Sequence, residues 1–172
     1  SPAQLYPKGE YASSFFITIT DDEDPTIADM PSNINDSADQ GSCSTTATWT
    51  EPTSDDNCGV GSLNSSHDSG DSFPVGTTTV TYTSTDVNGN THLESFDVII
   101  TDDEDPIISQ TPQNITQGLD QGSCSATVTW SSASASDNCQ VQSMGSDYNS
   151  GDPFTGGETT VTYTAVDLAG NS

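Results

Sequence analysis

Acidic side chains gather at two equivalent places in this sequence, where their spacing suits calcium. One run of acids occupies Asp21–Asp24, and a second run occupies Asp102–Asp105. A loop of Asp and Asn residues follows each run at the same interval, first Asp86–Asn90 and then Asp167–Asn171. Carboxylates held close together repel one another, whereas Ca²⁺ binds about six to eight oxygen ligands. The pattern therefore predicts two structural calcium sites, each between an acidic linker and a loop.

The best ligand candidates are the residues that recur in both copies of this pattern. They are Asp22, Glu23, Asp24, Asp86 and Asn90 at the first site, and Asp103, Glu104, Asp105, Asp167 and Asn171 at the second. Candidates of second rank lie on another loop that could reach the same ends, and they are Asp56, Asn57, Asp137 and Asn138. The alternative is that Asp and Asn only serve tight turns, and that the linker is a solvated acidic hinge.

The two places are equivalent because the whole chain repeats itself without insertions. The interval is 81 residues (124 − 43), and matched positions include Cys43 with Cys124, Trp49 with Trp130, and Cys58 with Cys139. A unit of this size buries only a modest core, so each unit is expected to need further stabilisation, such as a disulfide or a bound metal.

Short alternating runs of Thr, Val, Ile, Tyr and Phe, separated by turn residues, predict β-strands throughout. Val80 and Tyr82 would point inward from one strand, and Phe96, Val98 and Ile100 from the next. No segment has a helical period. About seven short strands per unit predict an all-β fold of two tandem immunoglobulin-like antiparallel β-sandwiches.

The second unit lacks a counterpart of the last strand of the first. The first unit continues through Ser95–Thr101, and a segment with the same alternation, Ser14–Thr20, precedes the first acidic linker. We therefore expect a donor strand, in which Phe15, Ile17 and Ile19 fill the gap in the second domain of another copy. The expected divisions are 1–20 (N-terminal arm and donor strand), 21–101 (first domain) and 102–172 (second domain, completed by residues 11–20 of another copy).

The charge of the chain excludes several partners. One Lys or Arg stands against 26 Asp and Glu residues, which gives a formal net charge of −25. Such a chain would be repelled by nucleic acid and by anionic membrane surfaces. Solubility, a halophilic chain or disorder could also explain the acidity. No apolar run approaches the ~20 residues that span a bilayer, and a secretion signal would lie outside this chain.

The four cysteines predict disulfides and an oxidising, extracellular setting, either secreted or at a cell surface. Pairing within each unit, Cys43 with Cys58 and Cys124 with Cys139, is the simplest arrangement and the one we expect. It requires the chain to fold back, because a regular strand from Cys43 to Trp49 is about 20 Å long, whereas the Cα atoms of a disulfide lie only about 4.4–6.8 Å apart. Pairing between neighbouring domains is the alternative.

Several motifs together resemble one known family. They are Asp24-Pro25, Gln40-Gly-Ser-Cys43, Trp49-Thr-Glu-Pro52, Asp56-Asn57-Cys58, Phe73-Pro-Val-Gly76 and Asp86-Val-Asn-Gly89-Asn90. This set is similar to the hyalin repeat (HYR) pattern over nearly all of residues 15–172. The resemblance implies an extracellular immunoglobulin-like module, usually in tandem arrays, with adhesive or matrix roles and no catalytic site.

The remaining signals concern modification and catalysis. The N-glycosylation pattern occurs at Asn35, Asn64 and Asn114. No Ser or Cys has a persuasive catalytic partner, so we expect no enzymatic activity. The favoured hypothesis is a protomer that forms an extracellular filament with other copies of itself, head to tail, with calcium-stiffened junctions. The alternatives are a segment of a long tandem-HYR adhesin or matrix protein, and a non-catalytic accessory module of a secreted enzyme.

Overall fold

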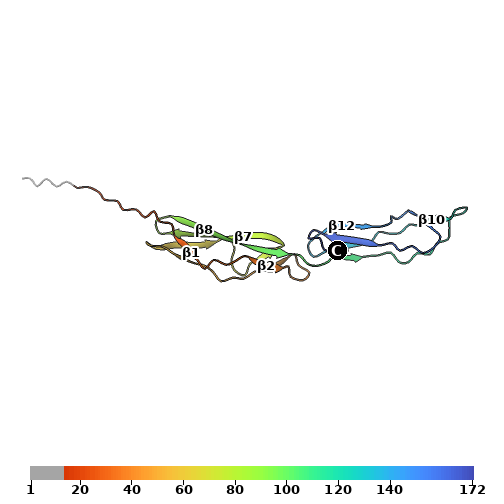
Figure 1. The fold of residues 1–172 in the computed structure, drawn as a ribbon, viewed down its shortest axis with the longest axis horizontal. Coiled ribbons are helices and arrows are strands. Elements are labelled where there is room, and N and C mark those ends of the chain that lie inside the picture. Colours follow the sequence, from red (N-terminus) through yellow and green to blue (C-terminus); the bar gives the residue numbers. More distant parts are fainter. Residues whose placement is uncertain (1–13) are drawn as a thin grey trace, which may run out of the picture.

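The computed structural model describes residues 14–172, so the part of the predicted arm at 1–13 lies outside the described residues. Residues 14–172 form fourteen β-strands and no α-helix. Within this range there is accordingly no helix that could cross a membrane. The strands form two domains that lie end to end (Figure 1). The predicted all-β class, with tandem immunoglobulin-like sandwiches, is confirmed.

The first domain contains eight strands arranged in a sandwich. They are β1 (Thr26–Ala28), β2 (Ile34–Ser37), β3 (Ser44–Thr46), β4 (Thr53–Asp55), β5 (Val60–Ser65), β6 (Ser72–Pro74), β7 (Gly76–Asp86) and β8 (Thr91–Thr101). Four of them form one sheet in the order β2-β8-β7-β5, while β1 pairs with β4 and β3 with β6. The pairs are antiparallel except β2 and β8, which run parallel.

The core of the first domain follows the predicted alternation. The buried residues Val80, Tyr82, Phe96, Val98 and Ile100 point inward from β7 and β8, as the sequence predicted. Ile27, Ala47 and Phe73 pack against them from the other strands, and Trp49 packs at the margin of this cluster. The core is therefore closed by β8, which supplies three of its largest side chains.

One polar network lies at the margin of this core. The Trp49 Nε1–H donates to the Tyr82 hydroxyl at 2.7 Å, and this hydroxyl donates to the Glu51 carboxylate at 2.5 Å. Tyr82 is 2% exposed, so its hydroxyl meets the requirement that a buried polar group be hydrogen-bonded.

The second domain contains six shorter strands. They are β9 (Ile107–Ser109), β10 (Ser125–Thr127), β11 (Ser134–Ser136), β12 (Val141–Ser146), β13 (Pro153–Thr155) and β14 (Tyr163–Asp167). They form three antiparallel pairs, β9 with β11, β10 with β13, and β12 with β14. Each pair reproduces, 81 residues later, a pair of the first domain.

The second domain lacks the strands that would depend on a counterpart of β8. Residues 115–118 correspond to β2, and residues 157–162 correspond to the first half of β7, but neither segment is a strand. As a result, β14 has five residues where β7 has eleven. In the first domain β8 lies between β2 and β7 and pairs with both. In the second domain no strand lies between residues 115–118 and 157–162, and we call this empty strand position the strand gap.

Side chains beside the strand gap are more exposed than their counterparts. Phe73 and Tyr82 are 1% and 2% exposed, whereas Phe154 and Tyr163 are only partly buried. Ile115, beside the gap, is 49% exposed. The described residues of the second domain thus bury only Ala126 and Ala165 fully among apolar side chains.

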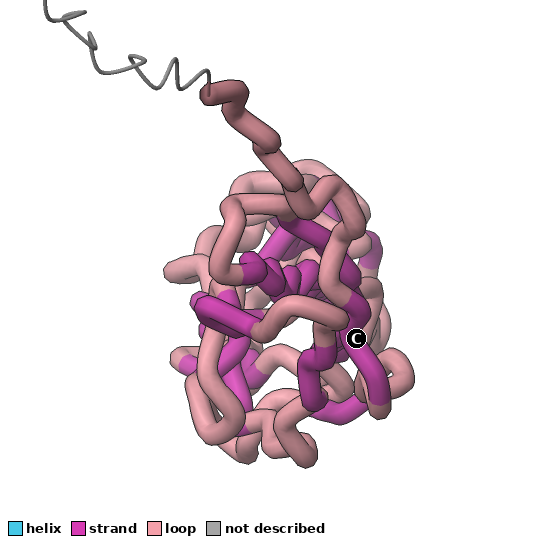
Figure 2. The backbone as a smooth tube through the Cα atoms, turned by 90° about the vertical axis from the view of Figure 1, so that its left-hand side faces the viewer, coloured by secondary structure: helices cyan, strands magenta, loops and turns pink. Residues whose placement is uncertain are grey.

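Residues 14–20 pair with no strand of the chain. Seen along the long axis, this segment leaves the body of the first domain as an isolated extended piece (Figure 2). Its predicted assembly residues, Phe15, Ile17 and Ile19, are 82%, 74% and 91% exposed. Exposed apolar side chains on an unpaired extended segment are the features of a strand that could add to another sheet.

Candidate metal centres

Three carboxylates converge at the free end of the first domain, and we call them the pole cluster. Asp21 comes from the linker before β1, Asp56 from the β4–β5 connection and Asp86 from the end of β7. One carboxylate oxygen of each lies within 4.8 Å of the other two. The described residues offer no Lys or Arg to balance these charges, because Lys8, the one Lys or Arg of the sequence, lies outside them.

Asp86 is fixed by the tight turn that joins β7 to β8. Its Oδ1 accepts hydrogen bonds from the backbone N–H groups of Asn88, Gly89 and Asn90 at 2.5–2.9 Å. Gly89 has φ of 101°, a conformation that favours glycine. Burial alone would raise the pKa of Asp86, but the hydrogen bonds from Asn90, Gly89 and Asn88 outweigh it and lower the pKa. The carboxylate is therefore held in its ionised form.

Asp56 is held in a similar way and has one oxygen to spare. Its Oδ1 accepts the N–H groups of Cys58 and Gly59, both at 2.9 Å, while its Oδ2 is buried without a partner. A buried carboxylate oxygen without a donor is costly, and a cation would satisfy it.

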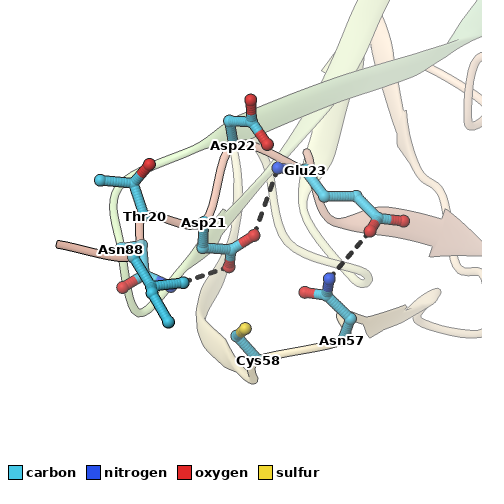
Figure 3. Close-up of a pocket in the computed structure, with 8 residues that line it drawn as sticks. Thr20, Asp21, Asp22, Glu23, Asn57, Cys58 and Asn88 are labelled. Atoms are coloured by element: carbon cyan, nitrogen blue, oxygen red, sulfur yellow. Dashed lines mark hydrogen bonds between the residues drawn. The ribbon is translucent and has the colours of Figure 1, made fainter. Parts of the chain in front are cut away.

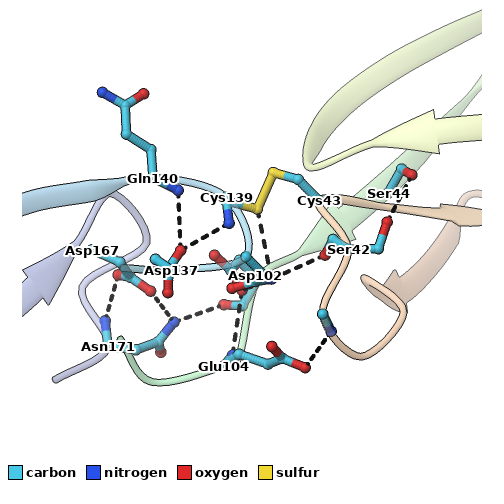
Figure 4. The surroundings of a disulfide bond; sticks show 12 residues. Ser42, Cys43, Ser44, Asp102, Glu104, Asp137, Cys139, Gln140, Asp167 and Asn171 are labelled. Atoms are coloured by element: carbon cyan, nitrogen blue, oxygen red, sulfur yellow. Dashed lines mark hydrogen bonds between the residues drawn. A yellow bond between two sulfur atoms is a disulfide. The ribbon is translucent and has the colours of Figure 1, made fainter. Parts of the chain in front are cut away.

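A second set, the junction cluster, lies between the two domains. It consists of Asp102, Asp137 and Asp167, whose oxygens also lie within 4.8 Å of one another (Figure 4). Asp167 is fully buried and Asp102 is 8% exposed. The Oδ1 atoms of Asp137 and Asn138 are buried without partners.

The pKa of Asp167 is set by the same balance as that of Asp86. Burial would raise it, but the side chain and backbone of Asn171, and the backbone of Gly170 and Ala169, lower it by hydrogen bonding. The junction cluster thus offers three carboxylates, and those of Asp102 and Asp167 are buried. One oxygen of Asp137 and the side-chain oxygen of Asn138 have no partner. These are hard oxygen donors, which fit Ca²⁺ better than a softer metal.

The structure brings together some predicted ligands and leaves others outside. Asp86 and Asp167 lie in the clusters, together with the second-rank candidates Asp56 and Asp137. The first-rank linker residues do not, and these are Asp22, Glu23, Asp24, Asp103, Glu104 and Asp105. The linker contributes Asp21 and Asp102 instead.

Strand alternation could have identified these two linker residues. Phe96, Val98 and Ile100 point inward from β8, and the same period of two continues to Asp102. Ile17, Ile19 and Asp21 repeat this pattern. A prediction that treats the linker as a uniform acidic run misses this signal.

The two asparagines predicted as ligands each hold a carboxylate through the side-chain amide nitrogen, and ligation of a metal by their oxygens stays a prediction. The Asn90 side-chain Nδ2 donates to Asp86 Oδ2 at 2.8 Å and to the Asp21 carbonyl at 3.2 Å. Asn171 makes the same contacts with Asp167 and Asp102 at 2.7 and 3.2 Å. Each asparagine therefore joins the loop to the linker, as the sequence predicted these segments to approach one another.

The disulfide joins the two domains, so the expected pairing within each domain is wrong. Cys43 bonds to Cys139, with Cα atoms 4.8 Å apart (Figure 4). Cys43 lies at the end of the first domain that meets the second, whereas Cys58 lies in the turn beside the pole cluster at the opposite end. The chain after Trp49 does not fold back far enough to bring them together. Cys58 and Cys124 remain free and exposed.

Three hydrogen bonds accompany the disulfide across the junction. Asn138 Nδ2 donates to the Ser42 carbonyl at 2.9 Å, and the Gly41 N–H donates to Glu104 Oε1 at 2.8 Å. Ser37 Oγ donates to Asp103 Oδ2 at 3.0 Å. Asn138, Glu104 and Asp103, which the sequence predicts as metal ligands, thus also contact the first domain. Asn138 does so through Nδ2, and its Oδ1 stays unpartnered.

Asp21 of the pole cluster lines an open pocket that also includes Cys58 (Figure 3). Glu23 Oε2 accepts a hydrogen bond from Asn57 Nδ2 at 2.8 Å, and Asp21 accepts one from Asn88 at 2.8 Å. Hydrogen bonding to the Asp21 carboxylate, followed by burial and by nearby acids, raises the pKa of the Cys58 thiol.

The three residues of the N-glycosylation pattern, Asn35, Asn64 and Asn114, are exposed, and their glycosylation stays a prediction.

Comparison with known proteins agrees with this architecture. The family model described as the HYR domain matches residues 20–100 and again 101–172. The chain belongs to the HYR domain family. It is 39% identical over 163 residues to hyalin of Strongylocentrotus purpuratus, which covers 92% of this chain and 14% of that protein.

Two further relatives also match most of this chain and are much longer than it. Hyalin of Lytechinus variegatus is 34% identical and covers 96% of this chain and 33% of that protein. The Sushi, von Willebrand factor type A, EGF and pentraxin domain-containing protein 1 of Mus musculus is 28% identical over 95% of this chain and 5% of that protein. The chain thus spans a third or less of these relatives. No solved structure gives a significant match to this HYR chain.

Proposed function

We propose that this HYR chain is a non-enzymatic structural unit of an extracellular adhesive or matrix assembly, in which copies join head to tail by strand donation. The observation that carries the proposal is the match between an unpaired, apolar segment at residues 14–20 and the strand gap of the second domain. Residues 14–20 of one copy would occupy the gap in another copy. They would pair there with residues 157–162 and 115–118, as β8 pairs with β7 and β2.

The donor has the side chains that the gap requires. Phe15, Ile17 and Ile19 correspond to Phe96, Val98 and Ile100 of β8, which are at most 4% exposed in the first domain. An added strand gains backbone hydrogen bonds along its length, and alternate side chains enter pockets that fix its register. The residues Phe154, Tyr163 and Ile115 would then lose the exposure described above.

The donor cannot reach the gap of its own chain. Residues 14–20 lead into the pole cluster of the first domain, while the strand gap belongs to the second (Figure 1). In this proposal residues 14–20 therefore fill the gap of another molecule, and a head-to-tail contact that does not close on itself produces a filament.

Calcium is the proposed structural cofactor of the pole cluster and the junction cluster. The support is the convergence of three carboxylates at each place, together with the unpartnered buried oxygens of Asp56, Asp137 and Asn138. Because each cluster includes the linker and two loops of the following domain, a bound cation would fix the linker to that domain. In a filament the pole cluster would then stand between two copies, as the junction cluster stands between two domains.

A second candidate function follows from the relatives, which are several times longer than this chain. In a long array of HYR domains, the strand gap would be filled by a segment of the same protein rather than by another copy. Such an array would have the same junctions but no need for self-assembly.

The experiment that tests the proposal is electron microscopy of the chain in the presence of calcium, with and without residues 1–20. Head-to-tail filaments are expected for the intact chain at high concentration, and monomers for the deletion variant. A stable monomer of the intact chain at all concentrations would support the array alternative. Filaments formed equally well by the deletion variant would show that residues 14–20 are not the donor.

A further inference from the structure

We infer that Cys58 of one copy forms a disulfide with Cys124 of the next, so that the chain is a covalently cross-linked polymer. This inference rests on the proposed head-to-tail assembly and adds to it a specific bond. Both cysteines are free and exposed in the chain. Cys58 lies beside the pole cluster, and Cys124 directly precedes β10 at the far end of the second domain (Figure 1). Neither has a partner within reach among residues 14–172.

The internal junction shows what such a bond would look like. There Cys43 bonds to Cys139 across the boundary between domains. The repeat of 81 residues relates Cys43 to Cys124, and Cys139 to Cys58. The two free cysteines are therefore the outer halves of the pair that is already joined inside the chain.

The free cysteines are held in the same local geometry as the bonded ones. The Cys58 N–H donates to Asp56 at 2.9 Å, and the Cys139 N–H donates to Asp137 at 2.9 Å. Each of these two cysteines thus lies in the same type of turn, closed by the aspartate two residues before it.

The other partner is equally well matched. A turn precedes Cys43, in which the Ser42 N–H donates to the Asp39 carbonyl at 2.8 Å and Gly41 has φ of 73°. Before Cys124 the Ser123 N–H donates to the Asp120 carbonyl at 3.0 Å, and Gly122 has φ of 79°. Since the turns at the free cysteines, Cys58 and Cys124, exist without a bond, these two thiols need little rearrangement to meet.

The residues that surround the internal disulfide also recur at the two ends. Across the junction Asn138 contacts the Ser42 carbonyl, and Glu104 contacts the Gly41 N–H. Their counterparts lie on opposite ends of the chain: Asn57 and Glu23 beside Cys58, and Ser123 and Gly122 beside Cys124. An isolated surface cysteine would not be accompanied by this matched set of residues.

One contact would not be reproduced. Ser37 donates to Asp103 at the internal junction, but the counterpart of Ser37 is Gly118, which has no hydroxyl. The contact between copies would therefore lack this hydrogen bond and keep the other two.

The bond forms by oxidation, for which a small-molecule disulfide serves as the oxidant. The thiolate of one cysteine attacks that disulfide, gives a mixed disulfide and releases one thiol. The thiolate of the other cysteine then attacks the protein-bound sulfur and releases the second thiol. Two protein thiols and one small disulfide thus become one protein disulfide and two small thiols, and each protein thiol loses one proton.

Two single variants test the pairing when they are mixed. Cys58→Ser retains only Cys124, and Cys124→Ser retains only Cys58, so each variant can form one bond at most. Incubated with oxidised glutathione and calcium, the mixture should give a covalent dimer on non-reducing gels. Docking raises the effective thiol concentration, so the mixture should give at least ~10-fold more dimer than either variant alone. The intact chain should give a ladder, and mass spectrometry should find the Cys58–Cys124 peptide.

Electron microscopy of the same samples separates this inference from the proposed assembly. Filaments that contain no covalent ladder after oxidation would overturn the disulfide while leaving head-to-tail assembly intact. Equal amounts of dimer in the mixture and in each variant alone would mean random pairing and would also overturn it. The absence of both filaments and a ladder would overturn the inference together with the assembly on which it rests.

Discussion

Ile17→Asp is expected to prevent assembly of this HYR chain, and the structure provides a matched control. The repeat interval of 81 residues relates Ile17 to Val98. Val98 is 0% exposed in the core of the first domain, whereas Ile17 is 74% exposed. The neighbouring Phe16 is 97% exposed, and the same interval relates it to Asp97. Asp97 accepts a hydrogen bond from Thr79 at 2.7 Å. Phe16→Asp therefore gives residues 14–20 the same residue that β8 has at the equivalent position.

The size of the effect follows from the change in exposure. Full burial of an isoleucine side chain stabilises by about 1.5–3 kcal/mol, of which the 74% exposed fraction gives about 1–2 kcal/mol. Placing a carboxylate there without a partner costs a further ~1–3 kcal/mol. The total of about 2–5 kcal/mol corresponds to about a 30- to 4,000-fold increase in the concentration needed for assembly.

Sedimentation of assembled material over a range of concentrations measures this directly. The intact chain and Phe16→Asp should assemble at similar concentrations, and Ile17→Asp should remain soluble far above them. If Ile17→Asp assembled as readily as the intact chain, the proposed register of the donor would be wrong. If Phe16→Asp failed as completely as Ile17→Asp, added charge rather than burial would be the cause.

Three further changes test other parts of the structure. Asp56→Asn should weaken calcium binding at one site at least ~10-fold in calorimetry, while Asp22→Asn, outside the cluster, should not; no saturable binding by the intact chain would contradict the calcium proposal. Cys43→Ser should lower the free energy of unfolding by about 4–5 kcal/mol in denaturant titrations, because a loop with a sequence separation of 96 is no longer closed; unchanged midpoints would contradict this. Burial, and then hydrogen bonding to Glu51, raises the pKa of Tyr82, so neutral Tyr82 stabilises the first domain below the ordinary tyrosine pKa of about 10. This contribution is lost as the pH rises through the higher folded value, and Tyr82→Phe should remove that part of the alkaline loss of stability in thermal melts.

The sequence could predict the strands of the first domain because burial follows a simple period. Phe96, Val98 and Ile100 alternate with polar residues, and all three are buried as predicted. The approach of the linker to the Asp86–Asn90 turn was also predictable, since the first strand and the β7–β8 turn lie at the same end of a sandwich.

The cluster members and the disulfide were harder to predict. Asp21 and its neighbour Asp22 are chemically alike, and only the direction of the side chain separates them. Cys43 and Cys58 are near in sequence, but they lie at opposite ends of the domain, so sequence separation was a poor guide to distance. The relative placement of two domains decides the Cys43–Cys139 bond, and no local pattern within one repeat contains that information.

The bond between Cys43 and Cys139 also determines how the chain would carry tension. A pull applied at the two ends passes through residues 14–43, crosses the disulfide and continues from residue 139. The intervening residues, with a sequence separation of 96, cannot be pulled out into an extended chain while the bond is intact. About 320–350 Å of potential extension is thereby withheld, at ~3.3–3.6 Å per residue. Mechanical unfolding of the first domain can reach only β1 and β2, whereas β14 and its partner β12 in the second domain remain in the path of the load. Reduction of a single bond would turn a short, stiff element into a long, extensible one.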